Sequence, residues 1–361
     1  MAEVLLGMSG GVDSTVSAYL LRRAGHKVTG ITFIMHGDDT SAADAVEGAR
    51  LAAREAGIDF TSADLRSRFR DAVESPFADA YFSGSTPNPC VLCNARIKFP
   101  ELLRYADELG FSHIATGHYA SVTEKNGYFH ISEPADKAKD QTYFLYSLGQ
   151  DVLSRLILPL SDLTKDDVRR IASEQGFSCA VKRDSQDVCF IPDGDVGAYL
   201  NGSRPGLSVP GDFTDASGKI LGRHKGIANY TVGQRKGLGI ASDAPLYVQR
   251  IDMKNNSVIL CRDNELFRCR IRVGGCVYAA EVPSEPFRAD VRIRYTKRVA
   301  PATVTPLSDG GAIVVFDSPQ RAPAPGQSAV FYLTEGGVSY VFGGGTIVYD
   351  PSLDFCFSDL T

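Results

Sequence analysis

The stretch VLLGMSGGVDS, from Val4 to Ser14, decides how the first part of the chain folds. Its apolar start predicts a short strand, and apolar residues recur at helical spacing from Val12 to Arg23. The glycine- and serine-rich turn between them must be tight. A strand that enters a helix through such a turn leaves backbone N–H groups unpaired at one point, where the helix dipole favours negative charge. The sequence therefore predicts a cradle for an anionic ligand.

The residues of this turn indicate which anionic ligand it binds. The turn lacks the GK[ST] ending of a Walker A loop and the spacing of a dinucleotide fingerprint. Its SGGVDS sequence, from Ser9 to Ser14, resembles the PP-loop (SGGxDS) of the ATP pyrophosphatases. The resemblance implies that the chain binds the pyrophosphate of ATP and passes AMP to an acceptor oxygen. The alternative is an ordinary glycine–serine turn, which the strand and helix on either side disfavour.

Composition limits the class of protein. With 361 residues, 43% of them hydrophobic and 22% charged, the chain is expected to form two or three soluble globular domains. The first apolar run is too short for a signal peptide, and no later run has spanning length, so we expect a cytoplasmic protein without a membrane partner. A net charge of −5 argues against a globally basic nucleic-acid coat but allows a local basic face.

Residues 1 to about 120 alternate strand-like and helix-like segments, as in a parallel sheet with crossovers. Strands are expected over 27–35, 58–62 and 112–115, and helices over 42–56 and 100–109. Another helix is expected over 162–176. Ligands of such sheets bind at the carboxyl ends of the strands. The residues expected to bind ATP are Gly7, Met8, Ser9, Gly10, Gly11, Val12, Asp13, Ser14, Phe33 and Gly117.

Near residue 200 the sequence changes to short β-type runs between Gly, Pro and Asp-Asn turns. The predicted fold class is therefore α/β. An N-terminal Rossmann-like PP-loop domain with a parallel sheet spans residues 1–200. A small β-rich central domain (201–263) and a C-terminal β-barrel (264–361) follow.

Two of the eight cysteines stand together in TPNPCVLCNARIKF, from Thr86 to Phe99. The prolines predict a loop, so Cys90 and Cys93 are expected just before a helix, where the dipole favours the thiolate. The CxxC spacing also fits a redox pair, half of a zinc site or coincidence, and zinc is disfavoured because no matched second pair follows. Cys189, alone, would more often be a buried and inert residue. We assign Cys179, Cys261, Cys269, Cys276 and Cys356 to core or surface.

Six motifs in order then make a resemblance specific: GMSGGVDS (7–14), TPNPCVLCNARIKF (86–99), ATGHYA (115–120), KDQTYFL (139–145), DSQDVCFI (184–191) and GIANYTVGQRKGLGI (226–240). Together they resemble the tRNA-specific 2-thiouridylases. The likeness continues into RYTKR (294–298) and PGQSAVFY (325–332).

The resemblance implies an enzyme that replaces the carbon-2 oxygen of the wobble uridine of certain tRNAs with sulfur. ATP, with Mg²⁺, adenylates that oxygen and releases pyrophosphate. Cys189 carries the sulfur as a persulfide, and Cys93 is the nucleophile that helps to release it and closes a transient Cys93–Cys189 disulfide. A cysteine desulfurase or a sulfur-relay protein supplies the sulfur. The residues agree with this, because a carbonyl oxygen is a poor leaving group without activation.

Cys90 departs from the family pattern, whose best-known members have Asp there as a proposed acid/base. A thiol can also exchange a proton. Alternatively, Cys90, Cys93 and Cys189 could hold a four-iron, four-sulfur cluster with one open iron, as in related tRNA thiolases. The sequence leaves both mechanisms open and predicts no other metal site. A second departure, a shorter segment between Phe33 and Ala42, leaves the Asp38–Asp39 loop without a role.

Two basic stretches lie in the β-rich half. The stretch from Lys219 to Lys236 has six basic residues and no acid, and basic residues flank Tyr295. Alone, such runs are more often solvated faces, yet phosphate contacts and stacking aromatics also bind RNA. The family resemblance favours RNA. The residues that match tRNA contacts are Asn88, Pro89, Cys90, His118, Lys139, Asp140, Gln141, Arg294, Tyr295 and Gln327.

Two other functions remain as alternatives. Another PP-loop enzyme, such as an amidotransferase-type synthetase or an argininosuccinate-type ligase, would use ATP without paired reactive cysteines. A non-catalytic tRNA-binding protein with a decayed loop would not turn over ATP.

Overall fold

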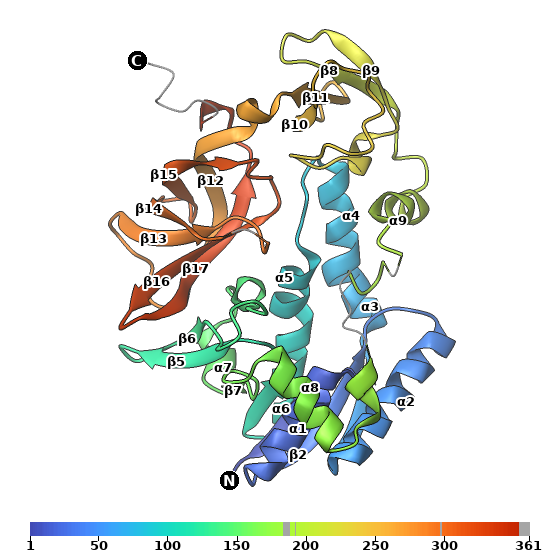
Figure 1. Cartoon of the computed structure of the whole chain (residues 1–361), viewed down its shortest axis with the longest axis vertical. Helices are drawn as coiled ribbons and strands as arrows, with labels where there is room; N and C mark the ends of the chain where they lie inside the picture. The colour runs from blue at the N-terminus through green and yellow to red at the C-terminus, as the bar shows by residue number, and fades with distance from the viewer. Residues whose placement is uncertain (183–187, 192, 297, 354–361) are drawn as a thin grey trace. The chain divides into compact units, whose positions relative to one another are not determined.

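The computed structural model describes residues 1–182, 188–191, 193–296 and 298–353 (Figure 1). The chain divides into two compact units. Unit 1 comprises Met1–Glu74, Cys90–Phe190 and Thr334–Phe342, and unit 2 comprises Ser75–Pro89, Ile191–Leu333 and Gly343–Thr361. Each unit combines segments that are distant in the sequence. The three-domain division at residues 200 and 263 stays a prediction.

A parallel five-stranded sheet in the order β3-β2-β1-β4-β7 forms the centre of unit 1, as the α/β fold class predicts. The strands are β1 (Glu3–Gly7), β2 (Lys27–Ile34), β3 (Asp59–Asp64), β4 (His113–Thr116) and β7 (Leu156–Ile157). β1 lies between β2 and β4, with Val4 opposite Val28 on one side and His113 on the other. A strand buried on both faces needs a continuous apolar run, and Val4, Leu5 and Leu6 are fully buried.

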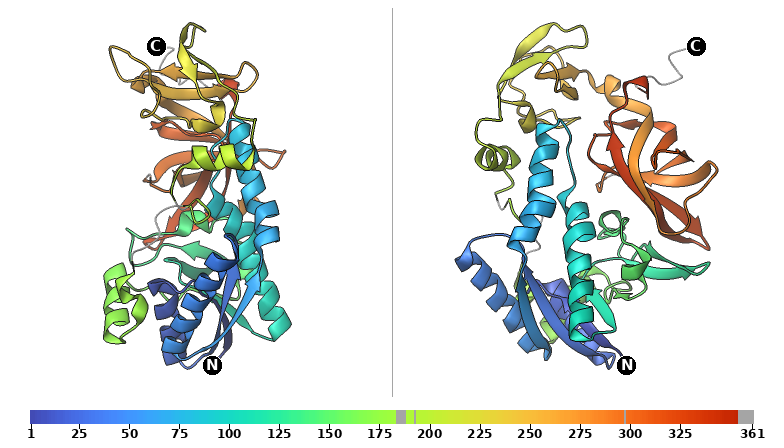
Figure 2. Two further views of the ribbon diagram at one scale, coloured as in Figure 1. Left: turned by 90° about the vertical axis from the view of Figure 1, so that its right-hand side faces the viewer. Right: turned by 180° about the vertical axis from the view of Figure 1, so that it is seen from behind.

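Helices α1 (Val12–Arg23) and α2 (Asp39–Ala56) pack on one face of this sheet and α6 (Phe99–Leu109) packs against β1 and β4 (Figure 2). The buried residues of α2 are all alanines, which lets the helix approach closely. α2 begins three residues earlier than expected because Asp38 caps it by accepting the Ser41 N–H. α8 (Lys165–Glu174) is shorter than expected because Thr164 and Asp167 form a capping box at its start.

The predicted loop at Cys90 and Cys93 is wrong. Helix α5 (Pro89–Cys93) continues through the π-helical turn η2 (Asn94–Lys98) directly into α6. Proline is tolerated in the first turn of a helix, where its missing N–H has no partner to lose and its φ suits the helix. Pro89 therefore starts the helix instead of preventing it. Both cysteines lie on this helix, three residues apart and on one face.

The remaining elements of unit 1 are small. Strands β5 (Ser121–Lys125) and β6 (Tyr128–Ser132) form a hairpin, and β6 pairs with β17 (Val338–Val348) at Tyr340. The short helices are α3 (Arg66–Phe69), η1 (Arg70–Glu74), η3 (Thr142–Phe144), α7 (Gln150–Leu153) and η4 (Ser178–Val181).

Unit 2 contains a four-stranded sheet in the order β10-β11-β8-β9. Its strands are β8 (Gly211–Thr214), β9 (Ile220–His224), β10 (Tyr247–Asp252) and β11 (Ser257–Cys261). They enclose an apolar core around Phe213, Val248 and Val258, all fully buried. The helices of this unit are α4 (Ser75–Phe82), α9 (Val196–Ser203), η5 (Ile227–Asn229), η6 (Asp263–Leu266) and η7 (Pro351–Leu353).

The predicted C-terminal β-barrel is confirmed. Its strands are β12 (Phe267–Tyr278), β13 (Phe287–Arg292), β14 (Ala300–Pro306), β15 (Ala312–Arg321), β16 (Ser328–Glu335) and β17. The barrel closes because β12 pairs with β15 on one edge and with β17 on the other. Closure leaves no open edge and fills the interior with fully buried side chains such as Val273, Val304 and Phe331.

Among the residues that the structure describes, no helix combines the length and the apolar character needed to cross a bilayer.

Candidate active site

The turn after β1 forms a rigid cradle. Gly11 caps α1 in an extended conformation, with φ −88° and ψ 166°, and no side chain caps the first turn. The backbone N–H groups of that turn are therefore open to a ligand. Gly10 has φ +69°, and a Cβ there would lie 3.0 Å from the backbone of Gly48 and Ala49 in α2. Only glycine fits at this point of the loop.

Hydrogen bonds anchor the cradle to β2. The Met8 N–H donates to the Ile31 carbonyl at 2.9 Å, and Thr32 Oγ1 donates to the Met8 carbonyl at 2.7 Å. Within the turn, Ser14 Oγ accepts from the Ser9 N–H at 3.3 Å. These bonds hold the turn between β1 and α1 in one conformation.

The other two predicted ATP residues lie on neighbouring strands. Gly117 follows β4, and a Cβ there would come within 3.0 Å of the backbone of Asp13 and Ser14. Phe33 lies near the end of β2, half-buried, with its ring centroid 5.8 Å from that of Tyr105. The structure thus places the predicted ATP residues at the carboxyl ends of β1, β2 and β4, on the turn that follows β1 or in the first turn of α1.

Two lysines and a tyrosine near this loop were not predicted from the sequence. Lys165 Nζ lies 2.7 and 2.9 Å from the two carboxylate oxygens of Asp13, and Tyr119 Oη donates to Asp13 Oδ1 at 2.8 Å. Lys182 Nζ donates to the Gly10 carbonyl at 3.4 Å. Asp13 and Lys165 are 152 positions apart, so no local pattern signals their pairing.

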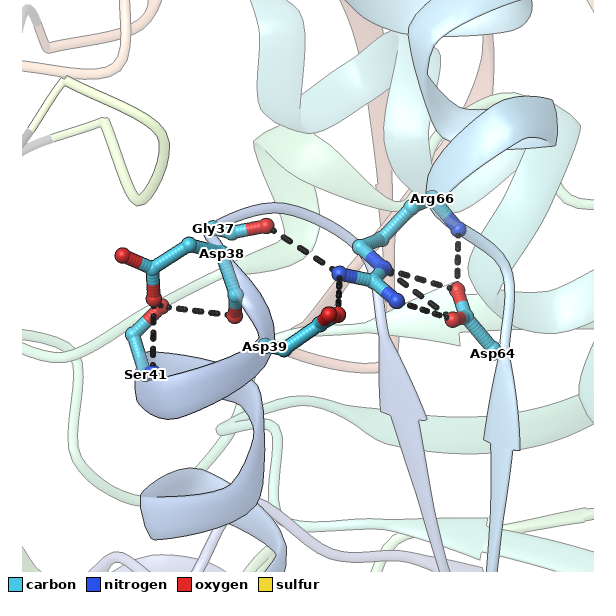
Figure 3. A network of polar contacts seen from close by, with 6 residues as sticks. All are labelled: Gly37, Asp38, Asp39, Ser41, Asp64 and Arg66. Carbon is cyan, nitrogen blue, oxygen red and sulfur yellow. Dashed lines mark hydrogen bonds and ion pairs between the residues drawn. The ribbon is translucent and has the colours of Figure 1, made fainter.

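The Asp38–Asp39 loop has a structural role (Figure 3). Arg66 Nη1 lies 2.7 Å from Asp39 Oδ1, while its Nη2 lies 2.7 Å from Asp64 Oδ2. Hydrogen bonds from Arg66 lower the pKa of Asp64, and hydrogen bonds from Ser41 lower the pKa of Asp38. Both carboxylates are therefore held ionised, and the network joins the start of α2 to the end of β3.

The three predicted sulfur-chemistry cysteines are free thiols and all belong to unit 1. Cys93 is buried, with its Sγ 3.8 Å from Met35 Sδ. Cys90 and Cys189 are exposed, although neighbouring segments displace part of the water around them. This loss of hydration raises the pKa of Cys93 and of Cys90. It also raises the pKa of Cys189 to about 11, and the charges of Cys93 and Cys90 add to this rise.

The predicted lowering of the thiol pKa is wrong for this arrangement. Loss of hydration on burial disfavours the thiolate more than any nearby positive charge favours it. The cation that opposes this effect at Cys90, Cys93 and Cys189 is Lys98, at the end of η2. A π-helical turn repeats at i+5 instead of i+4. It therefore brings Lys98 toward the helix face that carries Cys93.

The same thiols were considered as ligands of an iron–sulfur cluster. Within the described ranges, no three or more His, Cys, Asp or Glu side chains gather in a way that would hold a metal ion. In this arrangement the thiols do not fit a cluster.

The predicted tRNA contacts are distributed over both units. Cys90, His118, Lys139, Asp140 and Gln141 belong to unit 1, and Asn88, Pro89, Arg294, Tyr295 and Gln327 belong to unit 2.

Several of these side chains already have protein partners. His118 Nδ1 lies 2.8 Å from Thr116 Oγ1, and burial lowers its pKa well below the usual value, so the ring is neutral. Asp140 is buried and accepts the Thr142 N–H at 2.8 Å. Gln141 Oε1 accepts the Tyr119 N–H at 2.8 Å.

In unit 2, Arg294 Nη2 donates to the Val232 and Ala322 carbonyls at 3.0 and 2.7 Å. Gln327 Nε2 donates to the Thr86 carbonyl at 2.8 Å. Tyr295 is exposed. Lys297, within the second basic stretch, lies outside the described residues, as do Cys356 and residues 183–187.

A phosphate-binding loop on a parallel sheet, followed by a small β domain and a closed barrel, defines an ATP-using PP-loop protein with appended β domains. Three family models match the chain in the same order as these parts. The tRNA methyl transferase HUP domain matches residues 2–193, the tRNA methyl transferase PRC-barrel domain matches 199–262, and the aminomethyltransferase beta-barrel domain matches 268–347.

Curated relatives give the particular family. The tRNA-specific 2-thiouridylase MnmA of Clostridium acetobutylicum is 41% identical over 355 residues, which cover 96% of this chain and 99% of the relative. That of Syntrophotalea carbinolica is 43% identical over 350 residues, 96% of this chain and 98% of the relative. The chain belongs to the family of tRNA-specific 2-thiouridylases.

Proposed function

We propose that this protein is an ATP-dependent tRNA sulfurtransferase that converts the wobble uridine into 2-thiouridine. The observation that carries the proposal is that the PP-loop and the three thiols of Cys90, Cys93 and Cys189 occur in one unit. Relatives named for this activity match nearly the whole chain. An ATP-splitting loop alone would not require thiols.

In the first step the cradle binds ATP, with Mg²⁺ as part of the nucleotide substrate. The open N–H groups at the start of α1 and the dipole of that helix stabilise the phosphate charge. The uridine oxygen attacks the α-phosphorus, and pyrophosphate leaves with the bond electrons. The oxygen on carbon-2 becomes part of AMP, which is a far better leaving group than a carbonyl oxygen.

In the second step the terminal sulfur of a Cys189 persulfide attacks carbon-2, and AMP departs with the oxygen. The tRNA is then joined to Cys189 through a disulfide. The Cys93 thiolate attacks the sulfur of Cys189, which forms the Cys93–Cys189 disulfide and frees the thiolated uridine. A thiol reductant resets the enzyme, and a cysteine desulfurase or a sulfur-relay protein renews the persulfide.

Cys90 has a different role in this proposal. Its raised pKa keeps it a protonated thiol, and we assign it the acid/base role at the reacting uridine that the family resemblance implies. The alternative, an iron–sulfur cluster on Cys90, Cys93 and Cys189, remains testable. Anaerobic purification followed by iron and acid-labile sulfide analysis decides between the two, since an iron-free, fully active protein contradicts the cluster.

The residues proposed to contact tRNA are those given by the family resemblance: Asn88, Pro89, Cys90, His118, Lys139, Asp140, Gln141, Arg294, Tyr295 and Gln327. Because tRNA is the substrate, we expect the enzyme to act in the cytoplasm.

The test is nucleoside mass spectrometry of tRNA incubated with the protein, ATP and a sulfur source. We expect 2-thiouridine at the wobble position, dependent on ATP, and none with Cys93→Ser or Cys189→Ser. Absence of 2-thiouridine with the wild-type protein contradicts the proposal. Wild-type ATP turnover without thiolated product, unaffected by either serine substitution, would favour another PP-loop enzyme. No tRNA-dependent ATP turnover would favour a non-catalytic tRNA-binding protein.

A further inference from the structure

Two lysines from late segments of unit 1 reach the phosphate loop, and they reach it in different ways. Lys165 is the first residue of α8, and Lys182 follows η4. Each places its ammonium group against the loop, at Asp13 and at Gly10 respectively. A cradle for pyrophosphate needs positive charge. The partners that each ammonium group already has in the protein indicate which of the two lysines can bind the phosphate oxygens.

Lys165 is fully engaged with the protein. Its Nζ contacts both carboxylate oxygens of Asp13, and the residue is only 8% exposed. The backbone holds it as well, because the Lys165 N–H donates to Asp136 Oδ2 at 2.9 Å. The Asp13 side chain is 33% exposed, so breaking this partly buried pair leaves a charge that water only partly compensates. Lys165 therefore neutralises the carboxylate that Asp13 brings to the mouth of the cradle.

Lys182 has a weaker partner. It is exposed, and the hydrogen bond that its ammonium group makes within the described residues goes to a neutral carbonyl, that of Gly10, at 3.4 Å. A hydrogen bond between two ionised groups is shorter and about twice as strong as one between neutral groups. An arriving phosphate oxygen would consequently be a better acceptor for Lys182 than the Gly10 carbonyl.

The backbone of Lys182 is anchored. Arg169 Nη1 donates to the Lys182 carbonyl at 3.4 Å, and Cys179, three residues earlier, is buried in the core between α1 and α8. On the loop side, Gly10 lies so close to α2 that a Cβ added to it would be 3.0 Å from the backbone of Gly48 and Ala49. The ammonium group of Lys182 therefore lies beside the uncapped start of α1.

From this division of roles we infer that Lys182 binds the pyrophosphate portion of ATP directly, while Lys165 is a positioning residue that acts through Asp13. The inference rests on the proposed function, since it names a ligand-binding residue within the same ATP site. It also assigns different roles to two lysines that contact the same loop.

The direct test is calorimetric binding of ATP, pyrophosphate and AMP to the full-length wild-type protein and to Lys182→Met. A charge-assisted hydrogen bond is worth about 1.5–3 kcal/mol, so ATP and pyrophosphate should bind about 10- to 100-fold more weakly. AMP has no pyrophosphate, so its affinity should change less than threefold. Lys182→Arg should recover most of the loss. Unchanged pyrophosphate affinity in Lys182→Met overturns the inference.

The matched variant is Lys165→Met, alone and combined with Asp13→Asn. The single variant should lower the melting temperature and weaken the binding of AMP as well as pyrophosphate, because the loop itself is disturbed. The double variant removes both charges and should recover melting temperature. A selective loss of pyrophosphate with Lys165→Met, at normal stability, would assign the ligand to Lys165 instead. If the wild-type protein bound neither ATP nor pyrophosphate, the proposed function itself would fail.

Discussion

The phosphate loop and the thiol group of unit 1 are prepared for chemistry to different degrees. The loop is anchored to β2 through its backbone, and no side chain caps the helix that follows it. The thiols are protonated near neutral pH, because loss of hydration raises the pKa of all three. On the proposed function, ATP binding therefore uses groups that are already in place, whereas sulfur transfer requires the thiolates to form.

Substitution of the reacting cysteines should have the largest effect, and it should abolish thiolation without changing ATP binding. Cys93→Ser and Cys189→Ser should each reduce thiolation by about a thousandfold or more, because the loss of a reacting nucleophile is not compensated elsewhere. ATP affinity should stay within twofold of wild type, since the loop makes no use of the thiols. The thiolation rate is measured by single-turnover formation of 2-thiouridine, and the ATP affinity is measured by calorimetry. A parallel loss of ATP binding would show that the regions are not independent.

The second effect concerns the pH dependence of the thiols. The pKa of Cys189 rises from 9.0 to about 11 in the folded protein, and two pKa units correspond to about a 100-fold smaller thiolate fraction near neutral pH. Alkylation of Cys189, followed by peptide mass spectrometry in the ligand-free protein, should therefore keep accelerating beyond pH 9. Because the folded pKa is the higher one, this group's contribution to stability is complete below pH 9 and is lost between pH 9 and about 11. An alkylation rate that levels off near pH 7 would contradict the raised pKa of Cys189 and with it the contrast between the thiols and the loop.

The third effect concerns the preformed loop. Gly10→Ala places a Cβ 3.0 Å from the α2 backbone at φ +69°, so we expect a lower melting temperature and about tenfold weaker ATP binding. Gly11→Ala is the matched control for folding. At Gly11 φ is −88° and the nearest atom, Ser9 Oγ, is 3.5 Å away, so its melting temperature should be unchanged. Equal melting temperatures for the two variants would mean that the loop adapts and is not preorganised.

The smallest effect tests the cation beside the thiols. Lys98→Met removes the positive charge that lowers the pKa of Cys90, Cys93 and Cys189, so thiol alkylation at pH 8 should slow by roughly three- to tenfold. Lys98→Arg should retain most of the rate, because it keeps the charge. Faster alkylation in Lys98→Met would show that the residue shields the thiols instead of stabilising the thiolate.

The sequence by itself determined the parts of this protein that depend on local pattern. The apolar run and glycine turn from Val4 to Ser14 specify a strand, a loop and a helix within a few residues, and short alternating runs specify the β-barrel. The ordered motifs identified the family. These features are readable because strand and helix periodicity and turn chemistry act between near neighbours in the chain.

Only the tertiary structure decided what surrounds the reactive groups. Pro89 was expected to interrupt a helix, yet it begins one and so places Cys90 and Cys93 on a helical face. The thiols were expected to be acidified, but burial among distant segments reverses the direction of the pKa shift. The pairing of Lys165 with Asp13, across 152 positions, is likewise set by how α8 packs on α1. Hydration and charge pairing depend on which segments meet in space, and the local sequence does not contain that information.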